Sequence, residues 1–247
     1  MVYRINYRPF PPSSESGAGV YGVVGGMGPL ASVEFVRTIY EFGLHEREQN
    51  SPTVILYSDP SFPDRTTAFL KGDDDLLLAQ LKRVIRELCE MNAARIVLCC
   101  VTIHYLLPRL SAELRERIWS LLDVIADRLA TDDREYLLIC SSGTRRLKLF
   151  EGHPRWRHFK DRLVLPSAED QERIHRELIY PIKLNADVST QFPLLEEMLE
   201  KYRVNAFVAG CSEIHLLAKR YAASGNGHDV CIDPLTIIGR KIAESHV

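Results

Sequence analysis

The sequence lacks any strong excess of charge of one sign. Its 31 Lys and Arg residues nearly balance its 33 Asp and Glu residues, which leaves a formal net charge of -2. So weak a field neither steers nucleic acid nor holds a protein on an anionic membrane. The composition, with 46% hydrophobic and 26% charged residues, is that of an ordinary globular protein. It therefore predicts no nucleic-acid partner.

Long apolar runs are also missing. No stretch reaches the roughly 20 apolar residues that cross a bilayer, so no membrane partner is predicted. The first segment holds Pro9, Pro11 and Pro12 but too few apolar residues for a secretory signal, and we interpret residues 1–18 as a flexible leader. The six cysteines lie mostly in apolar runs. Without a secretory signal, they indicate reduced thiols in a cytoplasmic protein.

Short aliphatic or β-branched segments alternate with longer segments of helical period. This alternation is typical of α/β proteins whose parallel sheets are built from βα units. Seven strands are enough for one doubly wound sheet or for two smaller domains. The predicted strands are 20–24, 53–57, 95–100, 136–140, 163–165, 206–209 and 230–232, and the predicted helices include 77–88, 111–129, 168–183, 193–202 and 234–242.

Two predicted strands end in a cysteine, one in each half of the chain. Cys100 and Cys211 are each followed four residues later by a histidine, His104 and His215, and this repeated pattern indicates a pseudo-duplicated fold. In open parallel sheets, ligands bind at the carboxyl ends of the strands. Both thiols are therefore expected to face a substrate. Neighbouring side chains of a strand point to opposite faces, so Cys99 is expected to point away from the site.

Two opposed thiols can invert a carbon centre without a cofactor, because one thiolate removes a proton and the other thiol returns one from the opposite face. Each such transfer contributes about 100- to 10,000-fold to a rate. Cys211 precedes a helical pattern, and a helix N-terminus is expected to lower the pKa of its thiol. Two alternatives remain. The cysteines could serve core packing, or the two Cys-x-x-x-His pairs could bind zinc.

Three loops that follow strands carry further polar groups. The glycine-rich loop 25–29 could hold a carboxylate on its backbone amides or be a plain tight turn, and it matches no nucleotide-binding spacing. Arg65 could bind a carboxylate with two parallel hydrogen bonds, or lie on the surface and cap a loop. Residues 141–144 could offer hydroxyl and amide donors, or form an ordinary helix N-cap.

Taken in order, these segments resemble the aspartate/glutamate racemase superfamily, specifically its aspartate racemase branch, from about Gly19 onward. Cys100-Val101-Thr102-Ile103-His104 resembles the first catalytic motif, usually Cys-Asn-Thr-Ala-His, and it selects Cys100 over Cys99. Gly210-Cys211-Ser212-Glu213 resembles the second, usually Gly-Cys-Thr-Glu. Further similar segments are Gly25 to Ala31 (the opening loop), Pro63 to Thr66 (the carboxylate-binding arginine), Ser141 to Thr144, Lys183 (the lysine beside the substrate) and Ile232 to Pro234.

The resemblance implies two pseudo-symmetric α/β domains, each with a mainly parallel sheet flanked by helices, and an active site in the cleft between them. The domains would span 19–123, with 234–247 packing back onto it, and 124–233. It also implies a homodimer that racemises a small acidic amino acid, or acts on a dicarboxylate, without metal or pyridoxal phosphate. The implied catalytic residues are Cys100 and Cys211, and the implied substrate-binding residues are Met27, Arg65, Val101, Thr102, Ser141, Ser142, Lys183, Ser212 and Glu213.

One departure from the family pattern bears on the substrate. Val101 replaces the usual asparagine and cannot donate a hydrogen bond, and a lost bond to a charged group costs roughly 1.5 to 3 kcal/mol. Ile103 also adds bulk where the family has alanine. Val101 thus favours an alternative, a related isomerase or decarboxylase of small dicarboxylates that uses the same cysteines. A second alternative is a non-catalytic homologue that binds a small ligand.

Overall fold

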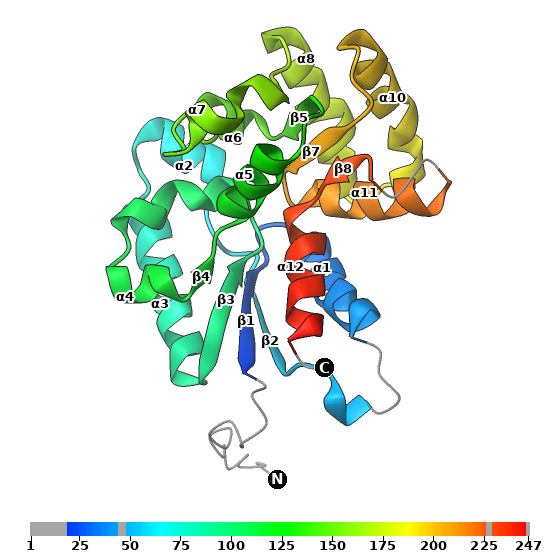
Figure 1. The fold of residues 1–247 in the computed structure, drawn as a ribbon. Helices are drawn as coiled ribbons and strands as arrows, with labels where there is room; N and C mark the ends of the chain where they lie inside the picture. Colours follow the sequence, from blue (N-terminus) through cyan, green and yellow to red (C-terminus); the bar gives the residue numbers. More distant parts are fainter. Residues whose placement is uncertain (1–18, 44–47, 226–228, 246–247) are drawn as a thin grey trace.

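In the computed structural model, residues 19–43, 48–225 and 229–245 are described, and the predicted leader lies outside them. The chain forms two lobes, each built on a four-stranded sheet with helices on both faces (Figure 1). All strand pairs are parallel. The predicted fold class, two α/β domains with parallel sheets, is therefore confirmed. Among the described residues, no helix is both long enough and apolar enough to span a bilayer.

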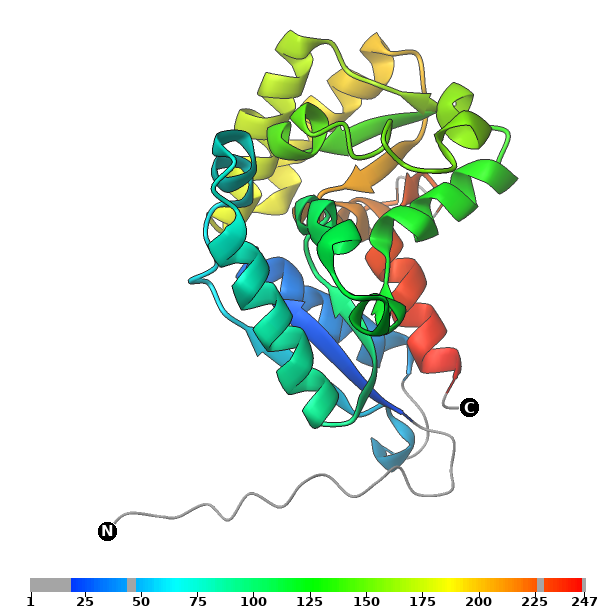
Figure 2. The ribbon, with the colours of Figure 1, turned by 90° about the vertical axis from the view of Figure 1, so that its left-hand side faces the viewer.

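The first sheet has the strand order β2-β1-β3-β4. Its strands are β1 (Val20–Gly25), β2 (Val54–Ser58), β3 (Ala93–Leu98) and β4 (Ile118–Trp119). One face is covered by α3 (Asp75–Glu90), whose six buried aliphatic residues recur at helical spacing, and α1 (Pro29–Phe42) and α12 (Pro234–Glu244) lie on the other (Figure 2). The C-terminal helix thus returns to the first lobe and packs along α1.

The second sheet repeats this order as β6-β5-β7-β8. Its strands are β5 (Tyr136–Cys140), β6 (Leu163–Val164), β7 (Phe207–Gly210) and β8 (Cys231–Ile232). One face packs against α10 (Phe192–Lys201), α11 (Glu213–Ala223) and a long helix made of α8 (Ala168–Arg173), the π-helical turn η4 (Ile174–Ile179) and α9 (Tyr180–Lys183). Because the two strand orders match, β3 and β7 occupy equivalent positions. The carboxyl ends of these two strands carry Cys100 and Cys211.

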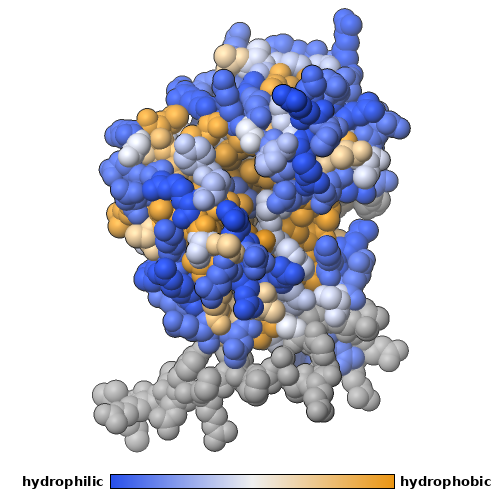
Figure 3. Space-filling view, turned by 60° about the vertical axis from the view of Figure 1, so that its left-hand side comes forward, coloured by the Kyte–Doolittle hydropathy of each residue, from blue (hydrophilic) through white to orange (hydrophobic). Residues whose placement is uncertain are grey.

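Strand alternation divides the core of the second lobe. Leu137 and Ile139 of β5 pack against the η4 and α10 side, whereas Leu138 and Cys140 belong to a second cluster. That second cluster continues into the first lobe through α5 (Leu121–Thr131), α1 and α12. The two lobes therefore share one hydrophobic core. Hydrophobic residues also show across the middle of the molecule on the face drawn in Figure 3.

The predicted helix over 111–129 is wrong. The structure has α4 (Ala112–Glu116), the short strand β4 and then α5, whose N-cap Ser120 accepts a hydrogen bond from the Asp123 amide. Ile118 and Trp119 pair with Ile96 and Val97 of β3, which adds an eighth strand to the seven predicted. A two-residue strand has no periodicity of its own. Only its distant pairing partner defines it.

Candidate active site

The carboxyl ends of the central strands of both sheets border one cavity of about 320 Å³. Seven of the eleven site residues implied by the sequence line it, namely Met27, Arg65, Cys100, Thr102, Ser141, Lys183 and Cys211. Val101, Ser142, Ser212 and Glu213 lie beside the cavity but do not line it. Five lining residues were not singled out by the sequence as substrate-binding, namely Asp64, Thr66, Thr67, His175 and Tyr180.

The two thiols reach the cavity from different lobes. Cys100 follows β3 and is 6% exposed, and Cys211 follows β7 and is 7% exposed. Cys99 is fully buried in the core on the opposite side of β3, where burial raises its pKa. The expectation that Cys99 points away is thus confirmed. Of these three cysteines, only Cys100 and Cys211 face the cavity.

Cys211 is held by the carboxylate that follows it. Its Sγ donates a hydrogen bond to Oε2 of Glu213 over 2.7 Å. Burial, and then the negative charge of Glu213, raise the pKa of Cys211 well above its ordinary value, and the opposing effect of Lys183 is weaker. The prediction of a lowered pKa was therefore wrong. Although the thiol does precede α11, desolvation and an adjacent carboxylate outweigh the helix N-terminus.

Two cations line the same cavity. Lys183 Nζ lies 3.7 Å from Glu213 Oε1. Burial is the largest single influence on the pKa of Lys183 and lowers it, but the negative charges of Glu213, Cys211 and Cys100 together outweigh burial and raise that pKa, so the amine stays charged. Arg65 donates to the carbonyl oxygens of Phe62, Pro63 and Met27 over 3.3, 3.0 and 3.0 Å. These bonds use only part of a guanidinium with five N–H groups, and they fix its position at the cavity.

A group of hydroxyls beside the cavity joins the two lobes. Thr102 Oγ1 lies 3.2 Å from Ser141 Oγ and 2.9 Å from Thr144 Oγ1. Ser141 also accepts a hydrogen bond from the Thr144 amide, so it is the N-cap of α6 (Ser142–Arg146). Ser142 is directed elsewhere, because its Oγ donates to Glu172 over 3.2 Å. Ser141 thus both caps a helix and lines the cavity.

The placement of Val101 accounts for its apolar character. Its side chain is 2% exposed and belongs to the hydrophobic cluster that also contains Cys99. A polar side chain at this position would have to be buried without water. The side chain of Val101 is therefore packed in the core and does not line the cavity.

The two histidines of the Cys-x-x-x-His pattern are both engaged with protein atoms. His104 Nε2 accepts a hydrogen bond from the Leu121 amide, so Nδ1 carries the proton and donates it to the carbonyl of Cys100 over 2.9 Å. His215 contacts Asp233 Oδ2 over 2.6 Å with Nδ1 and Thr38 Oγ1 over 2.9 Å with Nε2. No ring nitrogen is left for zinc. Within the described ranges, no three His, Cys, Asp or Glu side chains are grouped as metal ligands.

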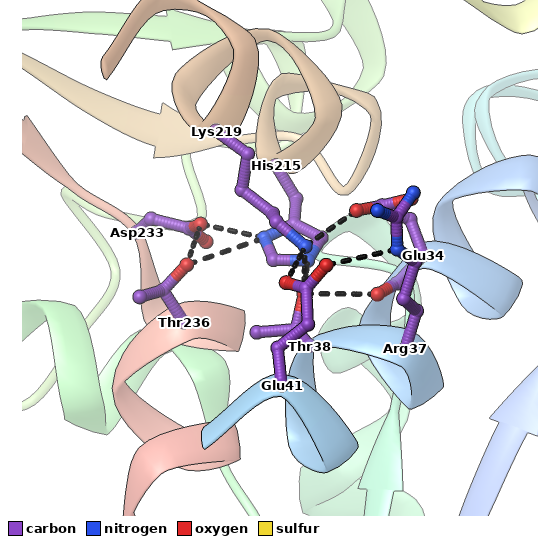
Figure 4. Close-up of polar contacts among 8 residues, drawn as sticks. All are labelled: Glu34, Arg37, Thr38, Glu41, His215, Lys219, Asp233 and Thr236. Carbon is purple, nitrogen blue, oxygen red and sulfur yellow. Dashed lines mark hydrogen bonds and ion pairs between the residues drawn. The ribbon is translucent and has the colours of Figure 1, made fainter. Parts of the chain in front are cut away.

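The contacts of His215 belong to a polar network between the lobes (Figure 4). Lys219 of α11 donates to Thr38 Oγ1 over 2.8 Å and to Glu41 Oε2 over 2.6 Å, both on α1. Thr236, at the start of α12, donates to Asp233 Oδ2 over 2.6 Å. The network therefore connects α1, α11 and α12 behind the segment that carries Cys211.

Comparison with known proteins places this architecture in a class. The two α/β lobes with parallel sheets match the fold of solved racemases, and a sequence profile described as Asp/Glu/Hydantoin racemase covers residues 24–240. The chain belongs to the Asp/Glu/Hydantoin racemase family.

Solved structures agree with this fold. An aspartate racemase from Picrophilus torridus shares 21% identity over 93% of this chain and 94% of its own, with a TM-score of 0.77. An aspartate racemase homologue from Pyrococcus horikoshii shares 18% identity over 92% and 99%, with a TM-score of 0.63. A glutamate racemase from Campylobacter jejuni shares 14% identity over 91% and 83%, with a TM-score of 0.53. At these identities the likeness establishes the fold.

Proposed function

We propose that this protein is a cofactor-independent racemase of an acidic amino acid, in which Cys100 and Cys211 act as the two acid/base groups. The observation that carries the proposal is that thiols from the two lobes line one small cavity together with Arg65 and Lys183. An acidic amino acid has one carboxylate more than its ammonium group can balance, and two cations suit that excess.

The proposed reaction needs one thiolate and one thiol. The thiolate takes the α-proton and becomes a thiol, which leaves a planar carbanion, and the opposite thiol donates its proton to the other face and becomes a thiolate. The hydrogen bond to Glu213 keeps Cys211 in the thiol form, which is the form that donates. Lys183 and Arg65 would hold the substrate carboxylates while the negative charge develops.

Isotope exchange tests this proposal. The protein is incubated in deuterated water with L- and D-aspartate and L- and D-glutamate, and α-proton loss is followed by NMR while chiral chromatography follows racemisation. We expect exchange and racemisation with at least one pair. Racemisation should fall by about 100- to 10,000-fold in Cys100→Ala and in Cys211→Ala. Cys89→Ala, a change on α3 away from the cavity, is the matched control.

Two results would contradict the proposal. Racemisation that survives both substitutions would remove the two-thiol mechanism. Conversion of an unsaturated or malonic diacid, with no exchange of any amino acid, would instead support the isomerase or decarboxylase alternative. A variant that still exchanges the proton of one enantiomer would show which face the remaining thiol serves.

A further inference from the structure

Two buried side-chain polar atoms of the described residues have no hydrogen-bond partner, and both belong to this site. They are Nδ1 of His175 and Oε1 of Glu213. Glu213 Oε1 at least faces Lys183. No hydrogen bond within the described chain uses either nitrogen of His175, although the residue lines the cavity. An imidazole that lines a cavity and makes no hydrogen bond within the described chain has a nitrogen to offer to a ligand.

A π-helical turn places His175 on the cavity side. In an α-helix, residues five apart lie about 140° apart around the axis. Here the Tyr180 amide bonds to the carbonyl of His175, which is the i to i+5 bond of a π-turn. The two rings consequently meet edge to face, with centroids 5.7 Å apart, and both line the cavity. Such turns occur frequently at functional sites.

Charged side chains of both signs surround His175. Glu172 and Asp64 are negative, and Lys183 and Arg176 are positive. Burial is the main reason why the pKa of His175 is lowered, so its ring is neutral at neutral pH. A neutral ring carries one N–H group. We place this N–H group on Nε2, which leaves the enclosed Nδ1 as an unprotonated acceptor.

We propose that His175 is a substrate-binding residue whose Nε2–H group donates a hydrogen bond to the side-chain carboxylate of the acidic amino acid, next to Lys183. This inference rests on the proposed function for the identity of the substrate. It adds a neutral donor to the two cations at the end of the substrate that distinguishes acidic amino acids from others. His175 thereby contributes to the preference for a carboxylate over an uncharged amide.

Two variants separate this role from a structural one. His175→Phe keeps an aromatic ring against Tyr180 but has no donor, and His175→Gln keeps an amide donor near the position of Nε2. For His175→Phe we expect the KM for the acidic substrate to rise about tenfold or more, with a much smaller change in kcat, and the preference for glutamate over glutamine to fall. His175→Gln should stay within about threefold of the wild-type KM.

The melting temperature tests the opposite possibility, that His175 has only a structural role. Because His175 makes no hydrogen bond within the described chain, His175→Phe should melt at the same temperature as the wild type or higher. His158→Ala, at an exposed histidine away from the cavity, is the control and should change neither KM nor melting temperature. A lower melting temperature together with an unchanged KM would show that His175 only packs, and would overturn the inference.

Calorimetric binding of glutarate, a dicarboxylate without an α-amino group, distinguishes this inference from the proposed function. If His175→Phe weakens glutarate binding while the wild type exchanges no amino-acid α-proton, His175 binds a carboxylate but the racemase proposal is wrong. If the wild type racemises and both proteins bind glutarate equally, the racemase proposal stands and the role of His175 is wrong.

Discussion

At the residue scale, Glu213 is the carboxylate around which the site is organised. It accepts a hydrogen bond from Cys211 and lies beside Lys183, although it does not itself line the cavity. The space for it is provided by Gly28, where an added Cβ would lie 2.4 Å from Glu213 Oε1. Next to burial, this 2% exposed carboxylate is the largest influence on the pKa of both the thiol and the amine, and it raises both pKa values.

We predict that Glu213→Gln makes Cys211 more reactive. The change removes a negative charge and supplies an amide donor, so the pKa of the thiol falls and the thiolate fraction rises. Alkylation of Cys211 by iodoacetamide at pH 7.5, followed by peptide mass spectrometry, should become at least about threefold faster. Glu172→Gln, at a carboxylate bonded to Ser142, is the control. An unchanged or slower rate would refute the role assigned to Glu213.

At the element scale, the histidine that follows each cysteine attaches one strand end to a helix. His104 connects the carbonyl of Cys100, after β3, to the first amide of α5. His215, in α11, connects Cys211's segment to Asp233 ahead of α12 and to Thr38 in α1. The repeated Cys-x-x-x-His spacing thus corresponds to two structural anchors behind the site, one for each lobe.

The His104 anchor predicts a loss of stability in acid. Burial lowers its pKa from 6.5 to about 4, so below pH 6.5 the unfolded chain binds a proton that the folded chain does not. The titration of His104 leaves the free energy of unfolding unchanged above pH 6.5. It lowers that free energy by about 3 kcal/mol as the pH drops to 4. In urea unfolding, the stability difference between wild type and His104→Gln should shrink by that amount from pH 7 to pH 4. A difference that does not change with pH would show that His104 does not cause the loss.

At the scale of the whole molecule, the lobes meet with almost no spare room beside the cavity. Gly143, in α6 of the second lobe, approaches Thr66 of α2 (Arg65–Lys71) in the first. A Cβ at Gly143 would lie 2.2 Å from Thr66 Oγ1. Because Thr66 lines the cavity and Thr102 bonds to Ser141 nearby, the separation of the lobes sets the geometry of the site.

We therefore predict that Gly143→Ala moves the lobes apart and lowers kcat/KM by about tenfold to a hundredfold, because small misplacements at a reacting centre are costly. Thr66→Ala removes the Oγ1 atom of this clash, so the double variant should recover part of the loss relative to Gly143→Ala alone. The measurement is the racemisation or exchange rate of the three variants. Strictly multiplicative effects would show that the two positions do not interact.

The amino-acid sequence by itself determined the elements and the thiols. Apolar segments of strand length alternating with helical periods predicted seven of the eight strands, and the strand-end positions of Cys100 and Cys211 predicted that both face one site. Alternation also separated Cys99 from Cys100. These features are readable because they depend on how a side chain is oriented within its own element.

The tertiary structure alone decided what depends on segments that are distant in sequence. The pairing of β4 with β3, the π-turn that places His175 at the cavity and the core position of Val101 leave no local periodic signal. The raised pKa of Cys211 depends on how deeply the thiol is buried in the folded chain, together with the neighbouring charge of Glu213. Sequence spacing records which side of its own strand or helix a residue occupies, whereas desolvation and cross-lobe distances arise only when the lobes pack together.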